Sequence, residues 1–189
     1  MQILQTIADH LGLIAGVALL LLAAAFWKTI LWIFGVLIIP DDSIGAVTKK
    51  FVLFGANRTL PDGQIIALNG EAGYQADTLP PGIQYGLWPW QYTVERVPFF
   101  TIPPAKIGVV QACDGKPLPG GRIIATDVDC DYFQDARRFL ISGGERGPQM
   151  KVIPPGTYRI NPLLFTVTLH DAINVPPGRL GVVEARDGR

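Results

Sequence analysis

Three aspartates alternate with other residues at Asp127, Asp129 and Asp131, a spacing that could place three carboxylates around a divalent cation. The pattern copies the first ligands of an EF-hand calcium loop. The rest of that loop does not follow, because Tyr132 stands where a glycine is needed and Arg138 where a bidentate glutamate is needed. Carboxylates that precede a helix are also favoured by the helix dipole. We therefore expect no metal and no cofactor, and these three aspartates are the only metal candidate.

Cys113, Cys130 and His170 are the residues that could form a thiolate nucleophile with a base. No local signature joins them, and the sequence has no C-x-x-C motif, P-loop or dinucleotide-binding glycine pattern. Two free thiols fit a reducing compartment, whereas a Cys113–Cys130 disulfide stays open as an alternative outside the cytoplasm. The sequence therefore predicts a protein without enzymatic activity.

The composition indicates a β-rich protein. The chain has 189 residues, and its 16 Lys and Arg residues balance 16 Asp and Glu residues. Because nucleic-acid binding needs a basic surplus, this balance argues against a nucleic-acid partner. The 21 glycines and 16 prolines separate runs rich in isoleucine and valine, which is typical of turns between strands and not of disorder.

A hydrophobic segment runs from Leu11 to Ile39, and Lys28 is its only charged residue. As a helix it would be roughly 43 Å long, which exceeds the hydrocarbon thickness of a bilayer. No Lys or Arg precedes it, and the apolar run is too long for a secretory signal. Residues 1–39 are therefore predicted to be a retained membrane anchor whose partner is the lipid bilayer.

Trp27, Lys28 and Trp32 lie together near the end of this anchor, as interfacial aromatic residues and a snorkelling lysine would. They place the core span at about 11–26, with 29–39 in or near the membrane interface. A straight tilted helix through the whole segment and a re-entrant hairpin stay open as alternatives.

The charges beside the anchor predict its orientation. Lys49, Lys50 and Arg58 follow the segment, whereas no Lys or Arg precedes it. The positive-inside rule then puts the C-terminal bulk in the cytoplasm, and free cysteines agree with that side. We expect a single-pass protein of the cell membrane.

One short sequence motif, called the phrase below, occurs three times, at residues 39–47, 102–110 and 175–183. Its proline fixes φ and lacks an N–H group, which suits the position before a strand. Its glycine allows a bulge or a close backbone approach early in that strand. The prolines and glycines of the three phrases are Pro40 and Gly45, Pro103 and Gly108, and Pro176 and Gly181. Each phrase should be a turn that leads into a strand.

Further blocks repeat in the same order behind the first two phrases, which indicates two homologous modules. Residues 60–67, 70–75, 79–82 and 89–94 match residues 118–125, 144–149, 153–156 and 162–167, and the third block holds the turns Pro81-Gly82 and Pro155-Gly156. We expect a first β-rich module at 40–101, a second at 102–174 and the start of a third, truncated module at 175–189. A strand without its module would make the chain a fragment of a longer protein.

Each module is predicted to be mostly strand, with equivalent strands in the two modules. The expected pairs are 44–51 and 107–113, 64–68 and 122–126, 83–87 and 157–160, and 92–97 and 165–170. Asn69-Gly70 and Asp114-Gly115 have the composition of hairpin turns.

The second module carries an insertion between Ala125 and Gly144 that is predicted to be helical over about 131–142. Asp131 could cap the helix, with Gln134 completing a capping box. Aromatic residues at helical spacing would face the sheet, and a Gly-Gly pair would end the helix. The fold class is therefore α+β and β-rich, with an N-terminal transmembrane helix and tandem β modules, the second holding a short helix.

The anchor, the phrases and the segments at 133–140, 143–149 and 153–162 together resemble the SPFH (Band 7) superfamily of stomatins, prohibitins and flotillins, most of all its bacterial flotillin-like members. The resemblance implies tandem Band 7-like modules on a membrane that assemble into a ring or cage. Members of the family scaffold membrane microdomains, and some regulate membrane proteases. It implies no catalytic residues. The long C-terminal coiled coil usual in the family is absent from this chain.

The leading expectation is a membrane-anchored, oligomeric scaffold that organises membrane microdomains with copies of itself. The alternative is a regulator that docks on a membrane protease or transporter through the helix at 131–142.

Overall fold

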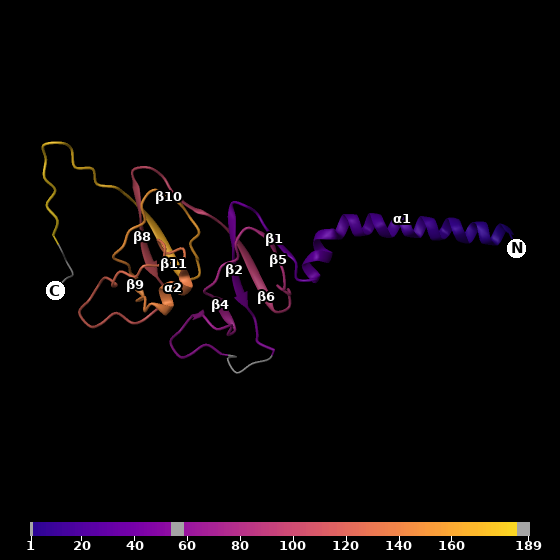
Figure 1. Ribbon diagram of the computed structural model, residues 1–189, viewed down its shortest axis with the longest axis horizontal. Coiled ribbons are helices and arrows are strands. Elements are labelled where there is room, and N and C mark those ends of the chain that lie inside the picture. Colours follow the sequence, from indigo (N-terminus) through magenta and orange to yellow (C-terminus); the bar gives the residue numbers. More distant parts are fainter. Residues whose placement is uncertain (1, 54–58, 185–189) are drawn as a thin grey trace.

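The computed structural model describes residues 2–53 and 59–184, and of residues 2–10 only the helical backbone. One long helix leads into two β-rich units, followed by an extended segment at the opposite end of the molecule (Figure 1). The predicted mixed α+β class with an N-terminal apolar helix is confirmed. Arg58 and residues 185–189, which entered the orientation and third-module predictions, lie outside the described residues.

Helix α1 spans Gln2–Ile33, because a long run of apolar helix formers continues without an internal proline. Its segment Leu11–Ile33 is long and apolar enough to cross a bilayer, with a mean hydropathy of 2.1 and none of it buried. The helix passes through Trp27–Trp32 without interruption and the chain turns at Gly35, which has a positive φ of 74°. Neither a re-entrant hairpin nor a helix through to Ile39 is formed.

The first unit, residues 37–98, contains two sheets. One pairs β1 with β5, and the other has the order β3-β4-β2-β6. The main ladder joins β2 and β6 in antiparallel fashion, from Ser43 opposite Pro98 to Lys49 opposite Tyr92. The strands are β1 (Leu37–Ile39), β2 (Ser43–Lys49), β3 (Ile66–Ala67), β4 (Gly73–Gln75), β5 (Gly82–Gln84) and β6 (Tyr92–Pro98).

The second unit, residues 100–171, repeats this plan with one helix added. One sheet pairs β10 with β7, and the other has the order β11-β8-β9. The ladder of β8 and β11 runs from Lys106 opposite Asp171 to Ala112 opposite Phe165. The elements are β7 (Phe100–Ile102), β8 (Lys106–Ala112), α2 (Ala136–Ile141), β9 (Gly147–Pro148), β10 (Gly156–Tyr158) and β11 (Phe165–Asp171).

Matching backbone pairs recur at equivalent positions of the two units. Each main strand makes one bridge just before the Pro-Pro-Gly turn, and each unit has a parallel contact beside its glutamine. The equivalent pairs are Gly45 with Leu79 and Gly108 with Ile153, then Ala67 with Gln75 and Ala125 with Gln149. The Pro-Gly turns have equivalent positions in the two units, since Gly82 and Gly156, which follow Pro81 and Pro155, begin β5 and β10.

Gly45 and Gly108 are needed because of a close approach and not because of a bulge. A Cβ at Gly45 would lie 2.8 Å from Ile39 Cδ1, and a Cβ at Gly108 would lie 2.7 Å from Ile102 Cδ1. Both main ladders continue through the glycine without an extra residue. Of the two interpretations of these glycines, the close approach is therefore confirmed and the bulge is wrong.

The three phrases form the same turn. The backbone N–H groups of Ser43, Lys106 and Arg179 each donate to the carbonyl oxygen of the proline three residues earlier, in every case at 3.2 Å: Pro40, Pro103 and Pro176. In the first two phrases a paired strand follows. After the third, residues 179–184 form no strand within the described part of the chain, and Gly181 lies in an extended, exposed segment.

The strands predicted at 83–87 and 157–160 end early, at Gln84 and Tyr158, and two other predicted strands are barely formed. Of 64–68 only Ile66–Ala67 forms β3, and 122–126 contributes only the bridge at Ala125. Several of their backbone N–H groups have other acceptors. Those of Ile65 and Thr126 donate to the carboxylates of Asp114 and Glu145, and those of Gln64 and Arg122 donate to carbonyl oxygens three residues earlier. Neither Asp114-Gly115 nor Asn69-Gly70 is a hairpin turn, and β3 and β4 on either side of Asn69-Gly70 pair in parallel. Sequence patterns also missed the short strands β1, β4, β7 and β9.

The helix in the insertion begins later than predicted, at Ala136 instead of Asp131. Asp131, Tyr132 and Phe133 have φ values of 51°, 50° and 66°, which a right-handed helix cannot contain. Gln134 still meets Asp131, its side-chain amide donating to the carboxylate at 3.1 Å, but within a turn.

Asp135 is the true N-cap, since its carboxylate accepts from the Arg138 backbone N–H at 2.8 Å. Gly143, with a φ of 86°, follows the C-cap residue Ser142, as predicted for the end of the helix. The prediction that aromatic residues of this region pack on the sheet is also confirmed: Phe139 and Phe133 are buried, with ring centroids 5.0 and 5.3 Å from that of Phe165 on β11.

One hydrophobic core crosses from one unit into the other. Ile66 and Ala76 of the first unit belong to the same buried cluster as Val110, Phe139 and Leu164 of the second. The units are therefore two copies of a strand plan that share a core, which holds them in one arrangement.

Candidate functional site

Two buried polar side chains, Asp114 and Asn161, lie at the junction between the two units. Asp114 follows β8 in the second unit, and its side chain is buried. Its carboxylate accepts from the backbone N–H groups of Ile65 and Ile66 in the first unit, both at 2.7 Å. Its other oxygen accepts from the Gly115 N–H at 2.7 Å. One carboxylate thus satisfies donors of both units.

Asn161 makes the reciprocal contact from the second unit. Its side-chain amide donates to the carbonyl oxygens of Gln75 and Ala76, at 3.1 and 2.9 Å. Its side-chain oxygen accepts from the Leu163 N–H at 3.0 Å, which holds the amide in place. Asn161 is 1% exposed, so its hydrogen bonds cannot be replaced by bulk water.

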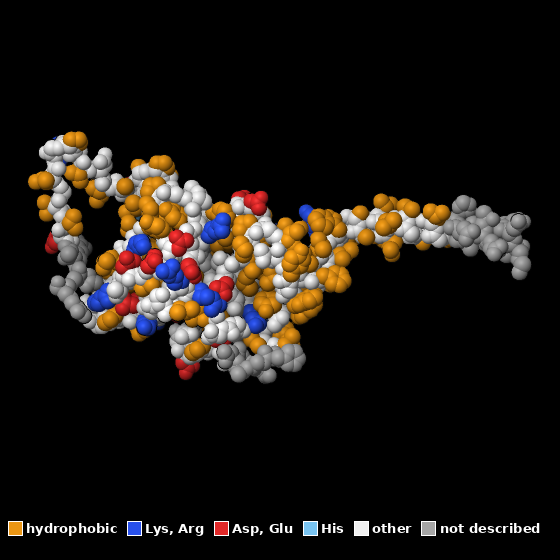
Figure 2. Space-filling model, in the orientation of Figure 1, with side chains coloured by type: hydrophobic (Ala, Val, Ile, Leu, Met, Phe, Trp, Pro, Cys, Tyr) orange, Lys and Arg blue, Asp and Glu red, His pale blue; other side chains and the backbone are white. Residues whose placement is uncertain are grey.

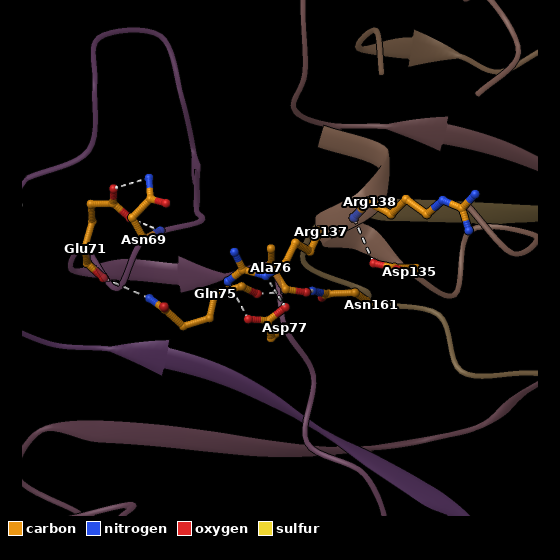
Figure 3. A network of polar contacts seen from close by, with 9 residues as sticks. All are labelled: Asn69, Glu71, Gln75, Ala76, Asp77, Asp135, Arg137, Arg138 and Asn161. Atoms are coloured by element: carbon orange, nitrogen blue, oxygen red, sulfur yellow. Dashed lines mark hydrogen bonds and ion pairs between the residues drawn. The ribbon is translucent and has the colours of Figure 1, made fainter. Parts of the chain in front are cut away.

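Arg137 on α2 and Asp77 after β4 form the charged part of the junction (Figure 3). The guanidinium is bidentate, with Nε 2.8 Å from Asp77 Oδ1 and a terminal nitrogen on Oδ2. This hydrogen-bonded carboxylate raises the pKa of Arg137. Because the side chains are 39% and 61% exposed, the pair adds orientation more than stability.

In each unit a glutamate and a glutamine form hydrogen bonds with the backbone beside the junction. The Gln75 amide donates to the carbonyl oxygens of Glu71 and Gly73, both at 2.9 Å, and Gln149 repeats these bonds in the second unit. The Glu71 carboxylate accepts from the Asn69 N–H at 2.8 Å. Burial alone would raise the pKa of Glu71, but its hydrogen bonds to the backbone and to Asn69 outweigh burial and lower that pKa.

Glu71→Gln should lower stability at neutral pH by about 1 kcal/mol, because a charged acceptor becomes neutral. The lowered pKa means that the unfolded chain binds this proton first, so the stabilisation is complete above the unfolded-state pKa and disappears as the pH falls through the folded-state pKa. The variant should therefore lose less stability between pH 7 and about pH 3 than the parent chain does. Urea titrations at both pH values measure this.

Glu145→Gln in the second unit is a matched second test. The Thr126 N–H lowers the pKa of Glu145 in the same direction, so that variant should change the acid dependence similarly. Equal losses of stability on acidification in Glu71→Gln and the parent chain would contradict the assignment.

A cleft of about 660 Å³ lies along the junction, lined by residues of both units. Its charged groups already have partners: Asp77 holds Arg137, Asp135 caps α2, and the Arg159 guanidinium lies 5.4 Å from the Phe99 ring centroid. Such an arrangement fixes the two units relative to each other.

The three candidate metal ligands are not brought together as a site. Asp129 pairs with Arg138 at 3.0 Å, and Asp131 accepts from Gln134. Within the described residues no group of three His, Cys, Asp or Glu side chains could hold a metal ion, and Asp127 is exposed.

The candidate thiol residues also lie apart. Cys113 and Cys130 are free cysteines, the first exposed and the second buried. Cys113 follows the end of β8, whereas His170 lies opposite Ile107 near its start, roughly 20 Å away along the strand. Burial raises the pKa of the Cys130 thiol, which makes it a poor nucleophile.

The predicted anchor residues all lie on α1. Leu11 begins its membrane-length segment, and Trp27, Lys28 and Trp32 lie near its end, with both indoles about half exposed. The junction residues that sequence patterns missed are Asp114, Asn161 and Asp77, because their contacts join segments far apart in the chain. No protein-family model, curated protein or solved structure matches the chain.

Proposed function

We propose that this protein is a membrane-anchored, non-enzymatic scaffold that assembles with copies of itself, in the manner of the flotillin-like SPFH proteins that its sequence resembles. The observation that carries the proposal is the junction, where the shared core and the buried Asp114 and Asn161 hold two similar units as one body. A rigid body on an apolar helix suits a protein that positions others at a membrane and performs no reaction itself.

The segment after β11 supplies a surface for assembly. Residues 173–184 lie away from the second unit (Figure 1), and Ile173, Leu180 and Val182 are all more than 90% exposed. The segment repeats the phrase that begins β2 and β8, and it forms the same turn. An apolar strand sequence with unpaired backbone groups is a template for pairing. The occupant proposed here is the same segment or a sheet edge of a second copy.

The alternative, docking on a membrane protease or transporter through the predicted helix, is less well supported. α2 places Phe139 and Ala136 in the core of this chain, and Arg137 and Arg138 already pair with Asp77 and Asp129. Little of the helix is left to present to a partner apart from Ile141.

The test is the mass of the full chain in mild detergent. We expect multiples of the 20.5 kDa protomer, and a monomer over the accessible concentration range would overturn the proposal. Val183→Pro removes a backbone donor from the exposed segment and should shift the distribution toward monomer. Val183→Thr keeps the donor and the β-branch, and should leave the distribution unchanged.

The proposal also places the C-terminal bulk in the cytoplasm, and the two cysteines test this. A membrane-impermeant thiol reagent should label Cys113 only after intact cells are permeabilised, because Cys113 is the exposed thiol. Buried Cys130 should react only on denaturation, so a Cys113→Ser variant is the control for labelling at that site. Labelling of Cys113 on intact cells would reverse the orientation.

A further inference from the structure

A groove of about 630 Å³ lies where α1 meets the first unit. Its walls come from the last turns of α1, from β1 and from β6. Trp32, Val36 and Ile38 provide apolar lining, and Lys28 and Arg96 provide its charges. The lining contains two cations and no acidic residue, although the chain as a whole is neutral.

Lys28 and Arg96 lack acidic partners in the part of the chain that the structure describes. Neither forms an ion pair there, and the Lys28 ammonium lies 5.9 Å from the Trp27 ring centroid instead. Other arginines of this protein, Arg122, Arg137 and Arg138, are each paired with a carboxylate. A pair of unneutralised cations beside an apolar surface favours an anionic ligand that also has an apolar part.

The groove lies at the depth of lipid headgroups if α1 crosses the bilayer. Lys28 precedes the end of the membrane-length segment at Ile33 by roughly 8 Å of helix. Figure 2 shows hydrophobic side chains continuing from α1 onto the adjoining face of the first unit. Phe34, just after α1, and Ile83 and Tyr85, in and just after β5, are exposed at 64%, 55% and 73%.

We propose that this groove binds one anionic phospholipid from the bilayer around α1. The phosphate lies between the Lys28 ammonium and the Arg96 guanidinium, whose fork fits phosphate oxygens. An acyl chain follows the apolar lining past Trp32 toward the membrane. A zwitterionic lipid carries its own cation beside the phosphate, and free phosphate has no apolar part, so neither matches the lining. The proposal rests on the membrane anchoring in the proposed function, and does not depend on self-assembly.

The experiment is native mass spectrometry of the full chain, released from detergent after addition of phosphatidylglycerol or phosphatidylcholine. We expect phosphatidylglycerol to bind about tenfold more tightly, as a charged hydrogen-bonded contact implies. Arg96→Gln and Lys28→Gln should each reduce this preference to near that of phosphatidylcholine, and Arg96→Lys should keep part of it.

Arg159→Gln, a cation on the second unit, is the matched control and should leave the preference intact. Equal binding of the two lipids to the parent chain would overturn the proposal, as would an unchanged preference in Arg96→Gln and Lys28→Gln. Displacement of phosphatidylglycerol by inorganic phosphate would also overturn it in favour of a soluble anion. A monomer that still selects phosphatidylglycerol would refute the scaffold and leave the lipid site standing.

Discussion

Asp114→Ala should lower the free energy of unfolding by about 3 kcal/mol or more. The substitution removes the acceptor of the Ile65 and Ile66 N–H groups, and Ile66 is 1% exposed, so its N–H group is left buried without its carboxylate partner. A buried donor left without a partner costs more than the net value of the hydrogen bond it made. Because both donors belong to the other unit, the loss also removes a bond between the units.

Urea unfolding of the full chain in detergent, followed by far-ultraviolet circular dichroism, measures this effect. Asp129→Ala is the matched control, since it removes a carboxylate from an ion pair whose side chains are 72% and 53% exposed. That change should cost less than about 1 kcal/mol. Amide exchange at Ile65 and Ile66 gives a second readout, and should accelerate in Asp114→Ala but not in Asp129→Ala. Equal stabilities of the two variants would refute the role assigned to Asp114.

The sequence repeats were sufficient to locate the two main ladders. Predicted strands at 44–51, 92–97, 107–113 and 165–170 overlap β2, β6, β8 and β11 closely. They could be located because each has a β-branched run, a fixed distance from a Pro-containing turn and an equivalent elsewhere in the chain. The close approach predicted at the glycine of each phrase also recurs in both units, since Gly45 and Gly108 contact equivalent isoleucines.

The insertion shows why local patterns fail when tertiary contacts compete with them. Asp131 and Gln134 have capping-box spacing, yet residues 131–133 adopt positive φ values that local propensity disfavours. Burial of Phe133 compensates for these unfavourable φ values, because this backbone conformation places Phe133 in the core against Phe165 while Tyr132 stays partly exposed. Sequence spacing contains no information about that packing.

The junction could not be predicted from spacing, although the repeat itself held one clue. At the position equivalent to Asp114, the first phrase is followed by Phe51 and the third by Asp187. At this position an aspartate therefore follows the second and third phrases, which have another unit before them in the chain, and not the first. Asp114 reaches back to that preceding unit, which explains why a phenylalanine suffices in the first. This sequence pattern can be interpreted only when the contacts of Asp114 are known.

Phe139→Ala should have the other large effect, lowering the free energy of unfolding by about 3–5 kcal/mol. Phe139 is fully buried, and its ring lies edge-on to Phe165 at 5.0 Å and near Phe133 at 6.3 Å. The backbone encloses it as well, since a Cβ at Gly144 would lie 2.5 Å from the ring. Such a site has little room to collapse around the missing ring, so the cavity cost adds to the lost transfer free energy.

Ile141→Ala on the same helix is the control, because Ile141 is 66% exposed and its truncation should cost less than about 0.5 kcal/mol. The decisive comparison is the double variant Asp114→Ala/Phe139→Ala. Both side chains support one core that includes Ile66, so their effects should not add, and amide exchange at Ile66 should accelerate in either single variant. Additive costs with two separate unfolding transitions would mean that the units fold independently. The inference that the two units form one rigid body, on which the scaffold proposal depends, would then be wrong.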